Sequence, residues 1–347
     1  MNHLRPTGAE PPGMPLETPT PSNTPAPANA PVPVAILSFN RPHYLSQVLD
    51  SLLAQTNLRN RPVLLFQDSA VSPITGKRFA RDEEIEACVT LFREKFPAGT
   101  VVLAEHNLGI ARNFLRAEER LFLDLDADAG YFFEDDMIVS PHYLTMMDQI
   151  YEFARKAERI AYFGAYGALI KPLEEQRKQP RAVKRFTHNW GFGLMRRHWK
   201  DLREWLVPYY QLSEGRDYKE RRTEEIADHY WKTGAPLISA DQDVMKQLGT
   251  CELGRVSINS FAVFAKYIGA EGVHFDRERF ETKGFSRTEM YPEPVELEFP
   301  NDATLEQFHA DERRNRWRRF HDRMEKNRAW RTNYERTIGP VPPVSHS

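Results

Sequence analysis

Short apolar runs alternate with longer segments of helical periodicity between residues 34 and 163. The apolar runs predict buried strands at 34–39, 63–68, 100–104, 130–133 and 160–163. The segments between them predict helices at 42–54, 82–96, 109–123 and 141–157. Strands that alternate with helices indicate an α/β fold, with an open and mostly parallel sheet that helices cover on both faces. In such sheets ligands bind at the carboxyl ends of the strands.

Proline is concentrated before the first predicted strand. Residues 1–33 hold ten of the chain's 25 prolines, together with little apolar surface. We therefore expect a disordered, Pro-rich leader over 1–33 and a folded part that begins at Val34. A linker is the favoured interpretation of the leader, and a ligand for a proline-binding domain is the alternative.

Charge and cysteine content exclude several classes of protein. The net charge of −2 over 347 residues argues against a dedicated nucleic-acid binder. Two cysteines, Cys88 and Cys251, exclude a disulfide scaffold and a thiolate zinc cluster. No apolar run approaches the ~18–20 residues of a membrane span, and residues 1–16 lack the apolar centre of a secretory signal. We expect a cytoplasmic protein without a transmembrane segment, and peripheral membrane association stays open.

The C-terminal part, 301–347, contains a predicted helix over 304–336. Residues 311–336 carry ten Lys and Arg against five Asp and Glu, and aromatic residues recur among them at helical spacing. Packing of the aromatic stripe on the main domain is the favoured interpretation. The alternative is a basic amphipathic helix that binds a membrane surface or an anionic polymer.

Three consecutive carboxylates, Glu134, Asp135 and Asp136, follow the predicted strand at 130–133 directly. Such carboxylates repel one another and lose hydration, so a cation is expected to offset them. A divalent metal ion with oxygen ligands, bridging to substrate phosphates, is one solution. The alternative is an acidic helix N-terminus, since Ser140-Pro141 begins the next predicted helix. The position at a strand end favours the metal.

The first strand–helix turn contains no glycine-rich phosphate loop. Any phosphate must therefore be held by metal and side chains. Asn40 and Arg41 follow the first strand, and Asp68 ends the second. Each is compatible with an ordinary solvated strand end, but together with the acidic triplet they describe one rim.

A second acidic pair, Asp241 and Asp243, precedes an apolar segment. A reaction with an attacking hydroxyl needs a base that takes its proton, and either carboxylate suits that role. The alternative is a helix cap at the start of 244–248, where Asp is common.

Two further candidate ligand-binding residues are an aromatic residue, Trp190, and a histidine, His274. Trp190 lies in a Gly-flanked segment and is a candidate for stacking on a ligand, whereas Phe192 is expected in the core. His274 is a candidate metal ligand or phosphate donor, with a structural role as the favoured alternative.

The order of these motifs resembles a nucleotide-sugar glycosyltransferase of the GT-A fold. Within this class, the chain resembles the N-acetylglucosaminyltransferase I family, which is glycosyltransferase family 13. The similarity extends over residues 34–280, and it rests on short motifs in the same order. These motifs are the segments 34–41, 66–68, 110–112, 133–143 and 189–199.

The resemblance implies roles for the acidic residues. Asp136 would coordinate Mn²⁺ or another divalent cation, while Glu134 and Asp135 would hold the ribose and the water shell of the metal. Asp243 resembles the catalytic base of the family, and Asp241 competes with it two positions earlier.

It also implies how the nucleotide would be held. Asp68 would contact the uracil and Arg41 the nucleotide, and Arg112 belongs to a segment that matches the family's Ile-Ala-Arg. Asn113 stands where the family has a nucleotide-binding His, so the base contacts differ here.

The resemblance implies a division of the chain and an activity. Residues 34–165 would bind the nucleotide sugar, and 166–300 would form the acceptor side. The implied enzyme is an inverting, metal-dependent transferase that moves a sugar, with GlcNAc expected, from a UDP-sugar to a hydroxyl of a carbohydrate or glycoconjugate. A family 2-like transferase with another nucleotide sugar is the related alternative, and a non-catalytic scaffold is the alternative from another class.

Overall fold

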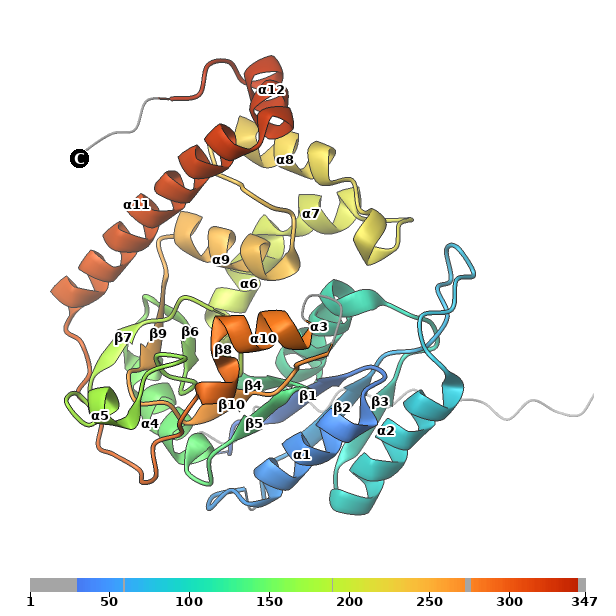
Figure 1. Ribbon diagram of the computed structural model, residues 1–347, viewed down its shortest axis with the longest axis vertical. Coiled ribbons are helices and arrows are strands. Elements are labelled where there is room, and N and C mark those ends of the chain that lie inside the picture. Colours follow the sequence, from blue (N-terminus) through green and yellow to red (C-terminus); the bar gives the residue numbers. More distant parts are fainter. Residues whose placement is uncertain (1–29, 59, 189, 272–275, 343–347) are drawn as a thin grey trace, which may run out of the picture.

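The computed structural model describes residues 30–58, 60–188, 190–271 and 276–342. An eight-stranded sheet with helices on both faces forms its centre (Figure 1). The order of the strands in the sheet is β3-β2-β1-β4-β8-β6-β9-β7. Their bounds are β1 (Val34–Ser38), β2 (Val63–Gln67), β3 (Thr100–Leu103), β4 (Ala129–Glu134), β6 (Ile160–Gly164), β7 (Val183–Arg185), β8 (Phe192–Met195) and β9 (Val256–Ser260). A separate antiparallel ribbon pairs β5 (Met137–Val139) with β10 (Ala265–Tyr267).

The first half of the sheet is parallel and the second half is mixed. Strands β3, β2, β1 and β4 run parallel to one another. Strand β8 lies antiparallel between β4 and β6, β6 and β9 are parallel, and β7 is antiparallel to β9. The predicted α/β fold is therefore confirmed, and the antiparallel β8 is an addition to it.

The predicted helices of the first half are present within a few residues. They are α1 (Pro42–Leu53), α2 (Asp82–Lys95), α3 (Gly109–Glu119), which continues into a π-helical turn at Arg120–Asp124, and α4 (Tyr143–Lys156). The second half contains α5 (Leu173–Gln176), α6 (Arg196–Trp205), α7 (Val207–Leu212), α8 (Thr223–Lys232), α9 (Gln242–Glu252) and α10 (Arg277–Lys283), with 3₁₀ turns at Tyr218–Glu220 and Phe285–Arg287. Among the described residues, no helix combines the length and the apolar character of a membrane span.

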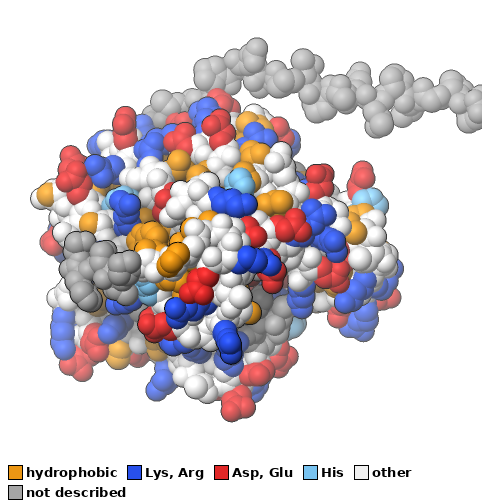
Figure 2. All heavy atoms as spheres, turned by 90° about the horizontal axis from the view of Figure 1, so that it is seen from above, with side chains coloured by type: hydrophobic (Ala, Val, Ile, Leu, Met, Phe, Trp, Pro, Cys, Tyr) orange, Lys and Arg blue, Asp and Glu red, His pale blue; other side chains and the backbone are white. Residues whose placement is uncertain are grey.

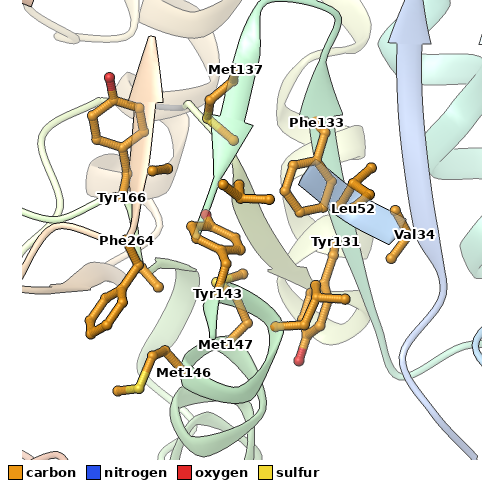
Figure 3. Close-up of a cluster of buried hydrophobic side chains, with 14 of the residues drawn as sticks. Val34, Leu52, Tyr131, Phe133, Met137, Tyr143, Met146, Met147, Tyr166 and Phe264 are labelled. Carbon is orange, nitrogen blue, oxygen red and sulfur yellow. The ribbon is translucent and has the colours of Figure 1, made fainter. Parts of the chain in front are cut away.

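Alternate strand residues feed two separate hydrophobic layers, because successive side chains of a strand point to opposite faces. Val34, Tyr131 and Phe133 pack with Leu52 of α1 and with α4 on one face (Figure 3). Ala35, Leu37 and Phe132 pack on the other face, which α3, α6, α8 and α9 cover. Burial of each large apolar side chain stabilises the fold by about 1.5–3 kcal/mol. Both layers together explain why β1 and β4 read as continuous apolar runs.

The folded part begins before Val34. Val32 is 5% exposed and belongs to the hydrophobic layer of α1. Its carbonyl accepts a hydrogen bond of 2.7 Å from Nη1 of Arg61, and the carbonyl of Pro33 accepts one from the amide of Tyr131. The expected boundary at Val34 is therefore too late, because residues just before β1 already extend the packing of the sheet. The rest of the expected leader, 1–29, lies outside the described residues.

Two helices, α11 (Asp302–Lys326) and α12 (Arg328–Thr337), replace the single helix predicted at 304–336. Asn327 separates them, and its side chain accepts the amide hydrogen of Trp330 to cap α12. The rings of Trp330 and Tyr334 pack edge-on against Trp231 of α8, with centroids 5.1 and 5.2 Å away. The aromatic stripe thus packs on the domain, as the favoured interpretation expected. Figure 2 shows positive and negative side chains interspersed on the face seen from above.

Candidate active site

The carboxyl ends of β1, β2 and β4 lie side by side at one edge of the sheet, since these strands are parallel neighbours. Arg41 follows β1, and its guanidinium bridges two acidic residues that follow β4. Nη1 lies 2.8 Å from Oδ2 of Asp136, and Nη2 is paired with Oδ1 of Asp135. The backbone amide of Phe39 also faces Asp135, at 3.4 Å. The expected cationic partner of the acidic strand end is thus supplied within the chain.

Two of the three acidic groups at this edge, Glu134 and Asp136, have raised pKa values. Burial, followed by the charge of Asp136, raises the pKa of Glu134 to about 8. Burial also raises the pKa of Asp136 to about 6, against the opposing effect of the Arg41 charge. Three ionised carboxylates and one guanidinium would leave a charge of −2, which explains why protonation is favoured here.

Helix α9 brings the second acidic pair to the same region. Asp243 in its first turn is exposed, and its charge is among those that raise the pKa of Glu134. Asp241 is the N-cap residue, and its carboxylate is paired with Nη2 of Arg221 and bonded by the hydroxyl of Ser239. Asp241 therefore occupies the N-cap position of α9, whereas Asp243 places its carboxylate near Glu134 at the end of β4.

Asp68 organises the loop before α3. Its carboxylate, 5% exposed, accepts hydrogen bonds from the amides of Ser69, Leu108 and Gly109 at 2.8–3.0 Å. The side-chain amide of Asn107 donates a further bond of 3.3 Å. Burial raises the pKa of Asp68, whereas these amide contacts lower it. The structure therefore uses both carboxylate oxygens to fix the turn that leads into α3.

The contacts given for three other predicted residues are with partners outside the acidic cluster. Asn113 is 3% exposed and links α3 to β2 through a bond of 3.2 Å to the carbonyl of Phe66. Arg112 is half-buried, and its charge acts on Tyr210 of the segment α7. Asn40 is half-buried, and its side chain forms a hydrogen bond with Glu84 of α2. The pKa of Glu84 is lowered mainly by its contact with Arg81, and the bond with Asn40 makes a smaller contribution in the same direction.

An aromatic wall borders the acidic cluster on the side of β10. The ring of Trp190 stacks on Tyr267, with centroids 4.9 Å apart and planes at 16°. Tyr267 in turn lies close enough to Asp136 for that charge to raise its pKa, after the larger effect of burial. Phe192, 3% exposed in β8, is in the core as expected. His274 lies outside the described residues.

A glycine allows this wall to form. Gly191 adopts φ +51, and a Cβ there would lie 2.0 Å from the Cε of Met137. Its carbonyl accepts a hydrogen bond of 2.6 Å from the hydroxyl of Tyr143. A side chain at position 191 would have to adopt a left-handed backbone and displace the end of the Met137 side chain, so glycine is strongly favoured there.

Sequence reasoning missed the contribution of two segments far along the chain. Gly269 follows β10, and a Cβ there would lie 2.6 Å from Oδ2 of Asp136. Tyr218 accepts the amide hydrogen of Gln242 at the start of α9, and its pKa is raised to about 12 by burial first. Asp217 beside it accepts bonds from the hydroxyls of Ser72 and Thr75 at 2.6 and 2.8 Å. No local pattern in the sequence marks these residues, because their partners are distant.

The donor set at the acidic strand end fits a divalent cation held jointly with a ligand. Asp135 and Asp136 offer hard oxygen ligands, and with Glu134 protonated a charge of −1 remains after Arg41 is counted. Within the described residues, no group of three or more His, Cys, Asp or Glu converges on a metal position. Cations such as Mg²⁺ are typically bound by one or two carboxylates together with substrate phosphates, so a pair of carboxylates suffices.

No protein-family model matches this chain, and no curated protein sequence does. Similar solved structures include S. aureus TarS residues 1–349, at 12% identity and a TM-score of 0.39, over 69% of this chain and 60% of that one. A second is GalNAc-T7 with UDP, GalNAc and Mn²⁺, at 12% identity and a TM-score of 0.45, over 91% of this chain and 59% of that one. Both proteins are glycosyltransferases. The aligned region thus spans about 60% of these two chains.

Proposed function

We propose that this chain is a glycosyltransferase that binds a nucleotide sugar at the carboxyl edge of β1, β2 and β4. The observation that carries the proposal is the meeting of two acidic sites at that edge. Asp135 and Asp136 follow β4, and Asp243 approaches Glu134 from α9. One site is suited to a cation and a diphosphate, and the other is suited to an attacking hydroxyl.

The donor side of the proposed site consists of Arg41, Asp135 and Asp136. A divalent cation, with Mn²⁺ the first candidate, would bind Asp136 and neutralise charge on the departing diphosphate. The base of the nucleotide would lie toward Asp68, which fixes the amides of 108 and 109 at the next strand end. The side chains of this chain thus orient the donor, and Arg41 adds positive charge near the phosphates.

The acceptor side of the proposed site consists of Asp243, which acts on Glu134, and of Trp190 and Tyr267, which lie beside Asp136. Asp243 is exposed, so it can receive a proton from a hydroxyl that approaches from solvent. The stacked rings of Trp190 and Tyr267 offer an aromatic edge against which a sugar could pack. Glu134 lies between the two sides, where its protonated form lowers the negative charge that the donor meets.

The sequence motifs supply the finer part of the proposal. Their likeness to the N-acetylglucosaminyltransferase I family supports an inverting transfer from UDP-GlcNAc to a hydroxyl of a glycan or glycoconjugate. A donor other than UDP-GlcNAc stays the alternative within the same class, because Asn113 replaces a nucleotide-binding His of that family. A non-catalytic scaffold has no need for Asp243 beside Glu134.

Donor hydrolysis across a panel of nucleotide sugars, with and without Mn²⁺, tests the proposal. We expect one donor to be hydrolysed well above the others, and only in the presence of a divalent cation. The absence of hydrolysis and of binding for every nucleotide sugar would contradict the transferase and favour the scaffold.

A variant at the metal residue tests the site itself. Asp136→Asn should abolish the Mn²⁺-dependent binding of UDP in calorimetry and leave the melting temperature within a few degrees of the wild type. Asp128→Asn is the matched control, since Asp128 precedes β4 at the opposite end and pairs with Arg196. Unchanged metal-dependent UDP binding in Asp136→Asn would contradict the assignment.

A further inference from the structure

Arg41 holds together the two carboxylates that the proposed function assigns to a divalent cation. Asp135 and Asp136 are 3% and 5% exposed, whereas the side chain of Arg41 is 26% exposed. The carboxylates are therefore enclosed, and the guanidinium closes them off from solvent. A divalent cation that approaches from solvent meets Arg41 first.

The same carboxylate oxygen cannot serve both cations without a rearrangement. Oδ2 of Asp136 contacts Nη1 of Arg41 at 2.8 Å. The backbone of Gly269 closes the oxygen from another side, because a Cβ on Gly269 would lie only 2.6 Å from it. A metal ion that binds this oxygen must therefore take the place of the guanidinium.

The arrangement lets the guanidinium leave without a change in the fold. The backbone of Arg41 is fixed as the N-cap residue of α1, with Pro42 at the next position. The guanidinium carbon lies 5.6 Å from the ring centre of the buried Tyr44, and the side chain of Arg41, at 26% exposed, has a path toward solvent. Rotation about the side-chain bonds of Arg41 therefore suffices to release Asp136, and α1 and β1 stay in place.

We propose that Arg41 is a resident counter-ion, which a divalent cation displaces from Asp136 and which then binds the diphosphate of the donor. The inference rests on the proposed function and adds an order of events to it. A guanidinium that has lost its carboxylate partners gains most from a new anion with several oxygens, and a diphosphate is such an anion.

A positive coupling between metal and diphosphate follows from this exchange. Without a diphosphate, the metal must separate Arg41 from Asp136 and leave the guanidinium unpaired. With a diphosphate, the released guanidinium is paired again, so the metal binds more tightly. Because such coupling is reciprocal, the metal must tighten the binding of the diphosphate by the same factor. A nucleoside without phosphate cannot produce the effect.

Titration of the full chain with Mn²⁺ by calorimetry, alone and with saturating UDP or uridine, tests the inference. In the wild type, UDP should tighten Mn²⁺ binding by about 10-fold or more, and uridine should have no effect. In Arg41→Gln, Mn²⁺ alone should bind about 10-fold more tightly than to the wild type, and UDP should tighten Mn²⁺ binding by a smaller factor than in the wild type, because only the direct contact between metal and diphosphate remains. Arg120→Gln is the matched control, because Arg120 forms an exposed pair with Asp124.

Arg41→Lys extends the test if Arg41→Gln does not fold, because it keeps a positive charge near Asp135 and Asp136. The compact, strongly hydrated ammonium lacks the two-nitrogen fork with which the guanidinium holds Asp135 and Asp136, so Mn²⁺ alone should bind more tightly than to the wild type. Equal or weaker Mn²⁺ binding in the folded Arg41 variants would overturn the inference. Failure of the proposed function itself would give a different result. In that case Asp136→Asn would bind Mn²⁺ and UDP as tightly as the wild type does.

Discussion

Asp241 and Asp243 are two positions apart, yet the structure gives their carboxylates different surroundings. Asp241 is engaged by Arg221 and Ser239 at the start of α9. Asp243 is exposed, and its charge reaches Glu134. The sequence left both residues as candidates for the base, and the structure favours Asp243 because its carboxylate lies toward the acidic strand end.

Substitution of the two residues should separate these roles. Asp243→Asn keeps the size and hydrogen-bonding capacity of the side chain but removes its ability to accept a proton. Sugar transfer should fall by roughly 10²–10⁴-fold, while the affinity for the donor stays the same. Asp241→Asn should lower the melting temperature through its contact with Arg221, with a smaller effect on the rate per folded molecule. A large loss of rate in Asp241→Asn alone, measured on folded protein, would reverse the assignment.

Glu134 makes the stability of the metal-free protein depend on pH. Burial raises its pKa to about 8, while an unfolded Glu has a pKa of about 4.3. The folded chain therefore binds more protons than the unfolded chain between these values, and its stability falls as the pH rises through that window. Glu134→Gln should be clearly more stable than the wild type at pH 8 and show little gain at pH 4, because only the ionised carboxylate is penalised in the folded chain.

Thermal unfolding in a chelating buffer from pH 4 to pH 8 measures this difference. Glu105→Gln serves as the control, since Glu105 is exposed. An advantage of Glu134→Gln that is equal at both ends of the pH range would show that the buried charge is not its cause.

Helix α9 depends on a buried ion pair for its position. Nζ of Lys246 pairs with Glu118 of α3, and both residues are 2% exposed. The indole N–H of Trp199 in α6 donates to the same carboxylate at 3.2 Å. Lys246 lies one turn after Asp243, so this pair sets where the candidate base stands relative to β4.

Removal of one partner should be costly, because it leaves an uncompensated charge in the core. Lys246→Met should destabilise the fold by about 3–5 kcal/mol in urea unfolding. Lys246→Met combined with Glu118→Gln should recover most of that loss, since the amide still accepts from Trp199 and no charge remains. A double variant as unstable as the sum of the two single variants would show that the pair does not act as a unit.

Within the described residues, Val32 is the first side chain that is buried, and the segment before β1 joins the sheet there. A chain that starts at Ala30 should keep the melting temperature and the donor hydrolysis of the full chain. A chain that starts at Pro33 loses the buried Val32 and the acceptor of Arg61, and should be less stable by about 2 kcal/mol. Equal melting temperatures for the two truncated chains would contradict the structural boundary.

The local pattern of the sequence was sufficient for α1, α2, α4 and the strands of the parallel half. Their apolar periodicity reports which face of each element is buried, and that property depends on residues a few positions apart. The acidic triplet was also visible, because a buried strand that runs directly into three carboxylates is a local feature.

Contacts between distant residues decided the rest. Strand β8 enters the sheet antiparallel between β4 and β6, and no periodicity in Phe192–Met195 specifies its neighbours. Arg41 meets Asp135 across 94 positions of the chain, and Asp68 accepts amides some 40 positions later. Such pairs form only when the folded sheet brings the strand ends to one edge. The free energy that holds them there comes from burial of the whole sheet, and not from the conformational preferences of residues that are neighbours in the sequence.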